Sequence, residues 1–190
     1  MARRKNVMQE KEEKELIDKL LAPKTQHTAF RELVDQYSRL LYWQIRKIVI
    51  SHHDTDDILQ NVFIKVWQNL NHFRNEAKLS TWLYRIAVNE SITFLNRERA
   101  KHNVSIDDAD VFLIAQLESD PYFDGNTADI ELQKAVLKLP EKQRIVFNMK
   151  YFDEMKYSEI SEILETSEGA LKASYHHAVK KIEEYLSKDD

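Results

Sequence analysis

Cysteine is absent from this chain of 190 residues, and glycine (2) and proline (3) are scarce. Without cysteine the chain can form no disulfide bond and has no thiolate chemistry, which agrees with a reducing cytoplasm. Few helix breakers and 32% charged residues favour long helices over a β-rich fold. No apolar run approaches the roughly 18 residues of a membrane span. Acids follow the basic start of the chain, so we expect no secretory signal and a protein of the cytoplasm.

Motifs of catalysis are also missing. The chain has no HExxH, no glycine-rich phosphate loop and no GxSxG sequence. His52-His53 and His176-His177 are adjacent pairs, and neighbours on a helix point about 100° apart, so neither pair forms an i,i+4 chelate. We therefore predict no catalytic residue, no metal site and no cofactor.

The negative charge is concentrated in one segment. The net charge is −4, yet residues 103–131 hold eight acids and no Lys or Arg, so the rest of the chain carries +4. The acids are Asp107, Asp108, Asp110, Glu118, Asp120, Asp124, Asp129 and Glu131. This asymmetry allows a nucleic-acid partner for the remaining chain.

Apolar periodicity predicts an all-α protein of two small helical domains joined by an acidic linker. In the first domain, residues 1–102, we expect helices at about 9–21, 28–50, from Asp54 or Asp56 to 70, and 79–101. Residues 103–126 form the linker, extended or partly helical. In the second domain, 127–190, we expect helices at about 127–138, 140–151, 158–164 and 168–186, with Pro140 at a first helical position and N-caps at Ser158 and Ser167.

The most informative helix is the one over residues 79–97, which Ser80 is expected to cap. Its apolar side chains share one arc: Leu83, Tyr84, Ala87, Val88, Ile92, Phe94 and Leu95. Trp82 lies on the opposite arc with Arg85 and Asn89. A ring that stacks, an amide that reads a base edge and a guanidinium that holds phosphate suit unpaired nucleic acid. The alternative is that Trp82 packs under a neighbouring helix.

The preceding helix presents a second candidate surface. Its outward arc holds Asp57, Gln60, Asn61, Ile64 and Gln68. An exposed isoleucine with a polar rim is typical of a helix-docking surface, and the alternative is a solvated face with one stray apolar residue.

The last two helices, joined by the turn at 165–167, predict a helix-turn-helix. The final helix is expected to bury one side, formed by Leu171, Tyr175, Ala178, Ile182 and Tyr185. Its other side, with the cap, forms the candidate DNA face: Ser167, Lys172, Ala173, His176, His177 and Lys180. The alternative is an ordinary helical hairpin with a solvated face.

In order and spacing, three blocks resemble the extracytoplasmic-function group of sigma-70-type bacterial sigma factors. They are DTDDILQNVFIKVWQNLNHFR, LSTWLYRIAVNESITFLNR and LPEKQRIVFNMKYFDEMKYSEISEILETSEGALKASYHHAVKKIEEYL. The resemblance covers about residues 30–186 apart from the linker. It implies a protein that binds core RNA polymerase, recognises the −10 and −35 promoter elements and starts melting. An anti-sigma factor is a further partner that the resemblance leaves open.

The resemblance also assigns roles to these surfaces. The first block implies polymerase contacts by Asp57, Gln60, Asn61, Ile64 and Gln68. The second implies that Trp82 meets the upstream edge of the melted −10 element, with Arg85 on phosphate and Asn89 reading a base. The loop 71–78, through Phe73 and Arg74, would hold a flipped base. The third implies that the final helix binds the −35 element.

Two departures and two rival functions remain. The helix-turn-helix often has Gly where this chain has Glu165, and arginines where it has Ser174 and His177. The rivals are a stand-alone helix-turn-helix regulator and a helical partner-binding protein without a DNA function. In the resembled family the linker runs through polymerase channels, so we expect its acids to act as an RNA-like placeholder or simply as a solvated tether.

Overall fold

The computed structural model describes residues 2–73, 77–102, 109–119 and 127–187, and every regular element in these ranges is helical. The N-terminal unit comprises α1 (Ala2–Leu21), α2 (Gln26–Val49), α3 (His52–Asn69), the 3₁₀ turn η1 (Leu70–His72) and α4 (Leu79–His102). Next come α5 (Ala109–Glu118) and the C-terminal unit of α6 (Thr127–Leu137), α7 (Glu141–Phe147), the π-helical turn η3 (Asn148–Phe152), α8 (Tyr157–Leu164) and α9 (Glu168–Leu186). The all-α prediction is confirmed.

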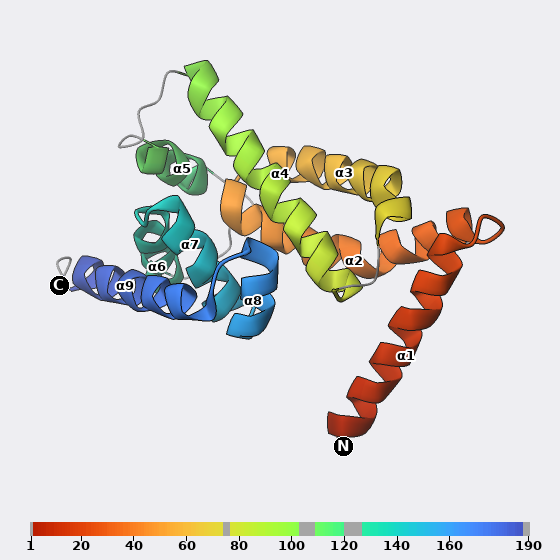
Figure 1. The fold of residues 1–190 in the computed structure, drawn as a ribbon. Helices are drawn as coiled ribbons and strands as arrows, with labels where there is room; N and C mark the ends of the chain where they lie inside the picture. The colour runs from red at the N-terminus through yellow and green to blue at the C-terminus, as the bar shows by residue number, and fades with distance from the viewer. Residues whose placement is uncertain (1, 74–76, 103–108, 120–126, 188–190) are drawn as a thin grey trace.

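In the N-terminal unit, α2, α3 and α4 pack on one another around an apolar core, as Figure 1 shows. Leu33, Leu41, Val62 and Leu83 in this core are fully buried. The helix α1 packs on α2 through buried Leu16, Ile17 and Leu20, while its N-terminal part extends away from the body (Figure 1). The shared core that the apolar periodicity predicted for these helices is present.

Helix ends differ from several predicted caps. Ser51 caps α3, because its Oγ accepts from Asp54 N at 3.3 Å. Ser80 lies inside α4, and the backbone N–H of Leu79 instead donates to Glu13 Oε1 of α1 at 2.6 Å. Only Ser167 caps as expected, accepting from Ala170 N at 3.3 Å.

Two more boundaries are wrong by a residue or two. Pro140 is the N-cap of α7 rather than its first helical residue. Lys156, not Ser158, precedes α8, and its backbone N–H donates to the Glu159 carboxylate at 3.0 Å. These helices nonetheless fall where the apolar spacing places them, because burial fixes position more firmly than end chemistry does.

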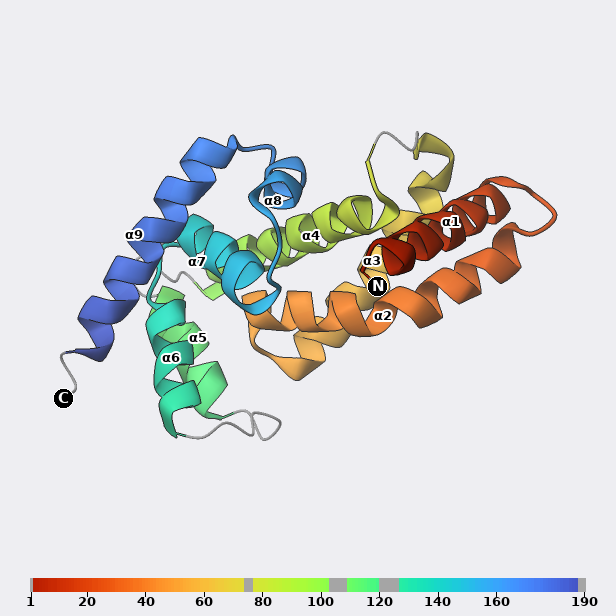
Figure 2. The same ribbon diagram turned by 90° about the horizontal axis from the view of Figure 1, so that it is seen from below.

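The two units pack against each other. The helix α4 runs between α3 on one side and α8 on the other, as Figure 1 and Figure 2 show. One continuous apolar cluster includes Leu83 and Val88 of α4 together with Ile145, Ile160 and Leu171 of the C-terminal unit. The sequence could not predict this placement.

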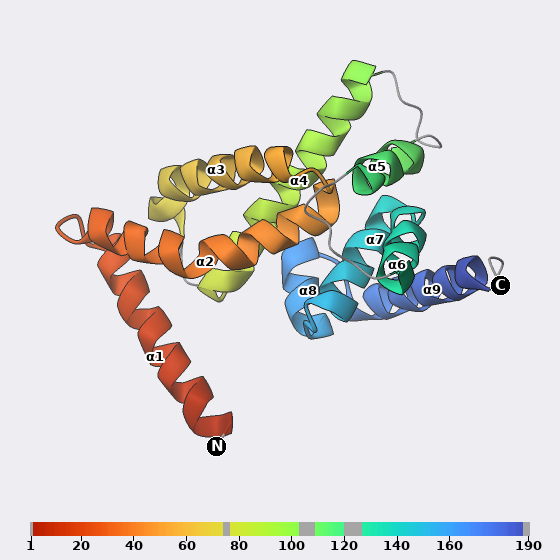
Figure 3. The same cartoon turned by 180° about the vertical axis from the view of Figure 1, so that it is seen from behind.

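The linker contains the helix α5, which lies beside α6 (Figure 3). Its Leu113 and Leu117 are buried in the large cluster. The expectation that the linker is extended or partly helical therefore holds for residues 109–119 as a docked helix. The rest of the linker lies outside the described residues.

Candidate nucleic-acid interface

The first candidate surface is a stripe along α4 formed by Trp82, Arg85 and Asn89, which we call the reading stripe. The i, i+3, i+7 spacing places the three side chains on one side of the helix. Asn89 is exposed, whereas Trp82 and Arg85 are half-buried. Trp82 is thus neither fully outside the core nor sealed within it, and it packs on the rim of the N-terminal core.

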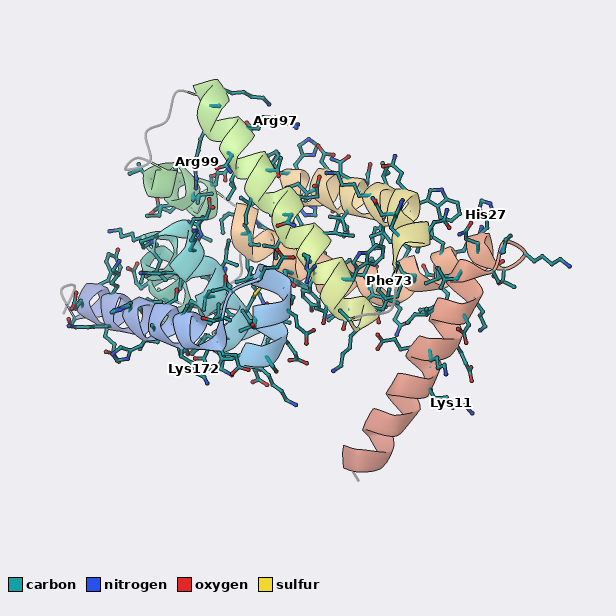
Figure 4. The ribbon with its side chains drawn as sticks, viewed as in Figure 1. Lys11, His27, Phe73, Arg97, Arg99 and Lys172 are labelled. Atoms are coloured by element: carbon teal, nitrogen blue, oxygen red, sulfur yellow. The ribbon has the colours of Figure 1, made fainter. Side chains whose placement is uncertain are left out.

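The ring of Phe73 packs against the ring of Trp82. The two ring centroids are 5.0 Å apart and the planes are tilted by 42°. Phe73 is only 9% exposed and belongs to the core, at the end of the 3₁₀ turn where Figure 4 labels it. Its ring is largely covered in this conformation, and a part for Phe73 in holding a flipped base stays a prediction. Arg74 lies outside the described residues.

The Arg85 side chain binds two groups of the C-terminal unit. Its Nη1 lies 3.2 Å from Glu165 Oε1, and its Nη2 donates to the backbone carbonyl of Glu162. Glu162 is in the last turn of α8, where carbonyls lack partners within the helix and the helix dipole is negative. Arg85 of the N-terminal unit therefore caps the C-terminal end of α8 in the other unit.

Glu165 has an unusual backbone. It ends α8 with φ 51° and ψ 40°, the left-handed conformation that glycine adopts without a steric penalty. This is the turn position where the sequence departs from the resembled family. Sequence reasoning noted that departure but did not find the contact of Glu165 with Arg85.

A groove of about 540 Å³ lies between α4 and the C-terminal unit beside this contact. Its apolar walls come from both units: Val88 and Ile92 of α4, and Ile145, Ile163 and Leu171 opposite. Asn89 also lines the groove. Of the reading stripe, Arg85 contacts the helix-turn-helix, Asn89 lines the groove but is exposed, and Trp82 packs within the N-terminal unit.

Partly buried polar groups also link α2 to the C-terminal unit. Lys47 of α2 pairs with Asp153 and also lies over the Phe152 ring, with Nζ 5.5 Å from the centroid. Burial raises the pKa of Asp153, and the pairing with Lys47 opposes that rise. Burial, and then the nearby Asp153, raises the pKa of Tyr84 to about 12.

The second candidate surface is the outward side of α3, which we call the docking face. Its members Asp57, Gln60, Asn61, Ile64 and Gln68 are all exposed. Ile64 is 53% exposed although it is a large apolar residue. Asp57 lies 3.8 Å from His53 of the preceding turn. The sequence predicted this exposure, and the apolar centre with its polar surround is present.

The third candidate surface is the recognition face of α9: Ser167, Lys172, Ala173, His176, His177 and Lys180, all exposed. Lys172, labelled in Figure 4, lies with its Nζ 5.5 Å from the centroid of the Tyr157 ring of α8. Two acids reduce the positive charge of this face, because Lys172 lies 3.3 Å from Glu168 and Lys180 lies 3.9 Å from Glu184. The predicted turn between α8 and α9 is confirmed.

One correction concerns the acidic segment. Lys134 of α6 lies 3.0 Å from Glu118 and 3.4 Å from Glu131, and its hydrogen bonds with these carboxylates, that with Glu118 first, raise the pKa of Lys134. The segment therefore has a counter-charge just beyond its end.

Across the described residues no helix is long and apolar enough to cross a bilayer.

Comparisons with known proteins agree with both units. The family model of sigma-70 region 2 matches residues 33–101, and that of sigma-70 region 4 matches residues 129–182. A Bacillus subtilis relative, the "ECF RNA polymerase sigma factor SigW", is 31% identical over 83% of this chain and 89% of its own length. A Haemophilus influenzae "ECF RNA polymerase sigma-E factor" is 27% identical over 89% of this chain and 95% of its own.

A solved structure shares the fold. It is the sigma factor RpoE of Bartonella quintana, in complex with the anti-sigma factor NepR, with a TM-score of 0.64 and 17% identity. The match covers 85% of this chain and 98% of that one.

Proposed function

Because the chain belongs to the extracytoplasmic-function RNA polymerase sigma factors of the sigma-70 family, we propose a division of labour among its three surfaces. The chain is a sigma factor that initiates promoter-specific transcription with RNA polymerase. Its region 2 match ends within α4 and its region 4 match contains the helix-turn-helix. We further propose that the chain acts in the cytoplasm and has no catalytic centre of its own.

The docking face binds core polymerase in this proposal. A central apolar side chain with a polar rim supports it, since such residues supply most of the affinity in protein interfaces. Ile64 at 53% exposure is that side chain, and Asp57 and Gln68 belong to its rim. An exposed apolar residue on this helix otherwise lacks a partner among the described residues.

The reading stripe receives the melted −10 strand. Trp82 offers a ring face for stacking, Asn89 an exposed amide for a base edge, and Arg85 a cation for phosphate. Phe73 contacts Trp82 from the core in the structure, so its proposed share in base flipping requires its own ring to become accessible. Arg74 is proposed as a participant on sequence grounds alone.

The recognition face of α9 reads the −35 element in the major groove. Its small Ala173 allows close approach, while Lys172 and Lys180 neutralise phosphate. The net charge of −4 is low for a protein that binds DNA by itself, so the proposal makes DNA binding dependent on polymerase.

The proposed domains are 1–102 for polymerase and −10 contacts, 103–126 for the linker and 127–190 for −35 contacts. The linker acids act as an RNA-like placeholder in a basic polymerase channel. Reaching such a channel requires α5 to leave its site, because Leu113 and Leu117 are buried there. Replacing the acids with Asn and Ser should change the pattern of abortive transcripts, and an unchanged pattern would leave the linker a tether.

An anti-sigma factor is a proposed partner. The support is that RpoE of Bartonella quintana, which shares this fold, was solved with one bound. The charged and apolar surfaces that polymerase would need are exposed on α3, so a protein bound there would compete with polymerase.

Run-off transcription tests the function as a whole. Core polymerase is incubated with fragmented genomic DNA of the source organism, with and without this chain, and the transcript starts are sequenced. New starts that share −10 and −35 elements are expected only with the chain present. A stand-alone regulator would instead protect duplex DNA without polymerase, and a partner-binding protein would give no new starts.

A further inference from the structure

The ion pairs between the two units share one polarity. Four join the N-terminal and C-terminal units among the described residues: Lys47–Asp153, Lys78–Glu159 at 3.6 Å, Arg85–Glu165 at 3.2 Å and Arg99–Glu141 at 2.9 Å. In every pair the N-terminal unit supplies the cation and the C-terminal unit supplies the carboxylate. This polarity agrees with the charges of the units, since residues 1–102 hold more Lys and Arg than acids and residues 127–190 hold more acids than Lys and Arg.

Three of these cations are distributed along α4. Lys78 directly precedes the helix, Arg85 belongs to the reading stripe and Arg99 lies in the last turns, where Figure 4 shows its position. Their partners Glu159, Glu165 and Glu141 come from α8, the turn after it and the start of α7. We call these three carboxylates the acidic face of the C-terminal unit.

The carboxylates of the acidic face pair with cations along α4 that could otherwise bind DNA phosphates. An arginine donates hydrogen bonds to carboxylate and to phosphate oxygens with the same forked geometry. Arg85 is held twice, by the Glu165 carboxylate and by the Glu162 carbonyl at the negative end of α8. The left-handed backbone of Glu165 orients this side chain at a position where glycine would be unstrained.

We propose that the acidic face substitutes for the phosphates of a promoter strand and holds the free sigma factor closed, with Arg85 of the reading stripe bound by the helix-turn-helix. The inference rests on the proposed role of the reading stripe in −10 recognition. The groove of about 540 Å³ and the shared apolar cluster complete the closed arrangement. A DNA strand competes with the acidic face for the same cations, so opening and strand capture are coupled.

Domain separation in the full-length free chain is the first measurement. The chain has no cysteine, so Gln36→Cys in α2 and Lys181→Cys in α9, both exposed, take a pair of dyes cleanly. Single-molecule energy transfer then reports the closed and open populations. Glu141→Gln/Glu165→Gln is expected to lower the closed population, and 0.5 M NaCl is expected to lower it in the parent, because salt screens partly exposed pairs.

The matched control has the same change in net charge. Glu154→Gln/Glu183→Gln removes two exposed carboxylates of the C-terminal unit that make no ion pair to the N-terminal unit among the described residues. Glu154 also shares the left-handed backbone, with φ 52°. A charge reversal adds a rescue: Glu141→Arg should open the chain, and Arg99→Glu/Glu141→Arg should close it again. Circular dichroism confirms that each variant is folded.

Strand capture is the second measurement. The probe is a labelled single-stranded oligonucleotide carrying the −10 sequence found by run-off transcription, titrated with the free chain. Two partly exposed ion pairs predict about 3- to 10-fold tighter binding by Glu141→Gln/Glu165→Gln, against less than about 2-fold for the control.

The outcomes separate the two ideas. Equal closed populations in all variants, or equal opening by the control, would overturn the inference, as would an opened chain that binds the strand no better. A parent that starts no transcripts would instead defeat the proposed function, whatever the energy transfer shows.

Discussion

Trp82 occupies a position between core and surface, and this sets what it can do. Its ring rests on buried Phe73 at 5.0 Å, so the indole is held in one orientation rather than free to rotate. A ring fixed from one side loses little conformational entropy when a base stacks on the other side. Its partial burial therefore favours a stacking role over the alternative of a purely structural one.

Trp82→Ala tests that role. Loss of one base stack is worth about 1–3 kcal/mol, so open-complex formation should fall about 5- to 150-fold, while Trp82→Phe should retain much of it. Permanganate reactivity of the melted strand and run-off yield measure the effect, at a temperature well below each variant's unfolding transition. The control is Trp43→Ala in α2, another indole, 51% exposed. If Trp82→Ala opens promoters like the parent, stacking by Trp82 is refuted.

Asp153 makes a prediction about pH. Burial raises its pKa against the opposing effect of Lys47, so the native state holds the proton more tightly than the unfolded state. The stability that this group contributes is fully present below its unfolded pKa near 4 and is lost as pH rises through the folded pKa. Asp153→Asn, which resembles the protonated form, should be more stable than the parent at pH 7.

That difference should vanish toward pH 4, and urea unfolding at several pH values measures it. Lys47 tolerates the loss because its side chain keeps 22% exposure to water. A variant less stable than the parent at pH 7 would mean that the ion pair outweighs the cost of burial.

At the scale of elements, helix positions were predictable and helix ends were not. Periodic apolar residues such as Leu83, Val88 and Leu95 locate α4, because burying one face is worth more than any end contact. The cap of α4 instead comes from Glu13, which is 66 residues earlier in the chain. A local pattern centred on Ser80 contains no information about such a contact.

The docking face on α3 was predictable for the same reason. Its members fall on the arc opposite to buried Ile58, Val62 and Val66, so their exposure follows from periodicity alone. Periodicity does not specify which partner such a face binds. The proposed polymerase contact therefore needs a direct test.

Ile64→Glu is that test. A charged side chain at the centre of an apolar contact should weaken binding to core polymerase about 10-fold or more. The free energy of unfolding should change by less than about 0.5 kcal/mol, because Ile64 is already exposed. Fluorescence titration with core polymerase measures the affinity, and Leu40→Glu in α2, with 52% exposure, is the matched control. Equal affinities for Ile64→Glu and the parent would remove α3 from the interface.

For the whole molecule, the arrangement of the units depends on contacts that no local pattern contains. The apolar cluster joins α4 to α7, α8 and α9, and each ion pair across the junction links residues far apart in sequence. The sequence predicts two helical units joined by an acidic linker. It does not predict that the C-terminal unit places its carboxylates against α4, because that requires the relative orientation of the units.

Two tyrosines report on this packing. Burial raises the pKa of Tyr37, inside the N-terminal unit, and of Tyr84, beside Asp153 at the junction, each to about 12. The native state therefore keeps both phenolic protons. The stability that they contribute is present below pH 10 and is lost as pH rises through 12. The free energy of unfolding should decline over this range, and less steeply in Tyr37→Phe/Tyr84→Phe.

Absorbance at 295 nm distinguishes the two rings. The parent should show a delayed ionisation phase near pH 12 that shrinks in Tyr37→Phe and again in Tyr84→Phe. Tyr37 depends on the N-terminal core and nearby Glu13, whereas Tyr84 is also influenced by Asp153 of the other unit. If Tyr84→Phe left the delayed phase unchanged while Tyr37→Phe reduced it, Tyr84 would be open to water. The N-terminal core would then be intact while the two units stood apart in solution.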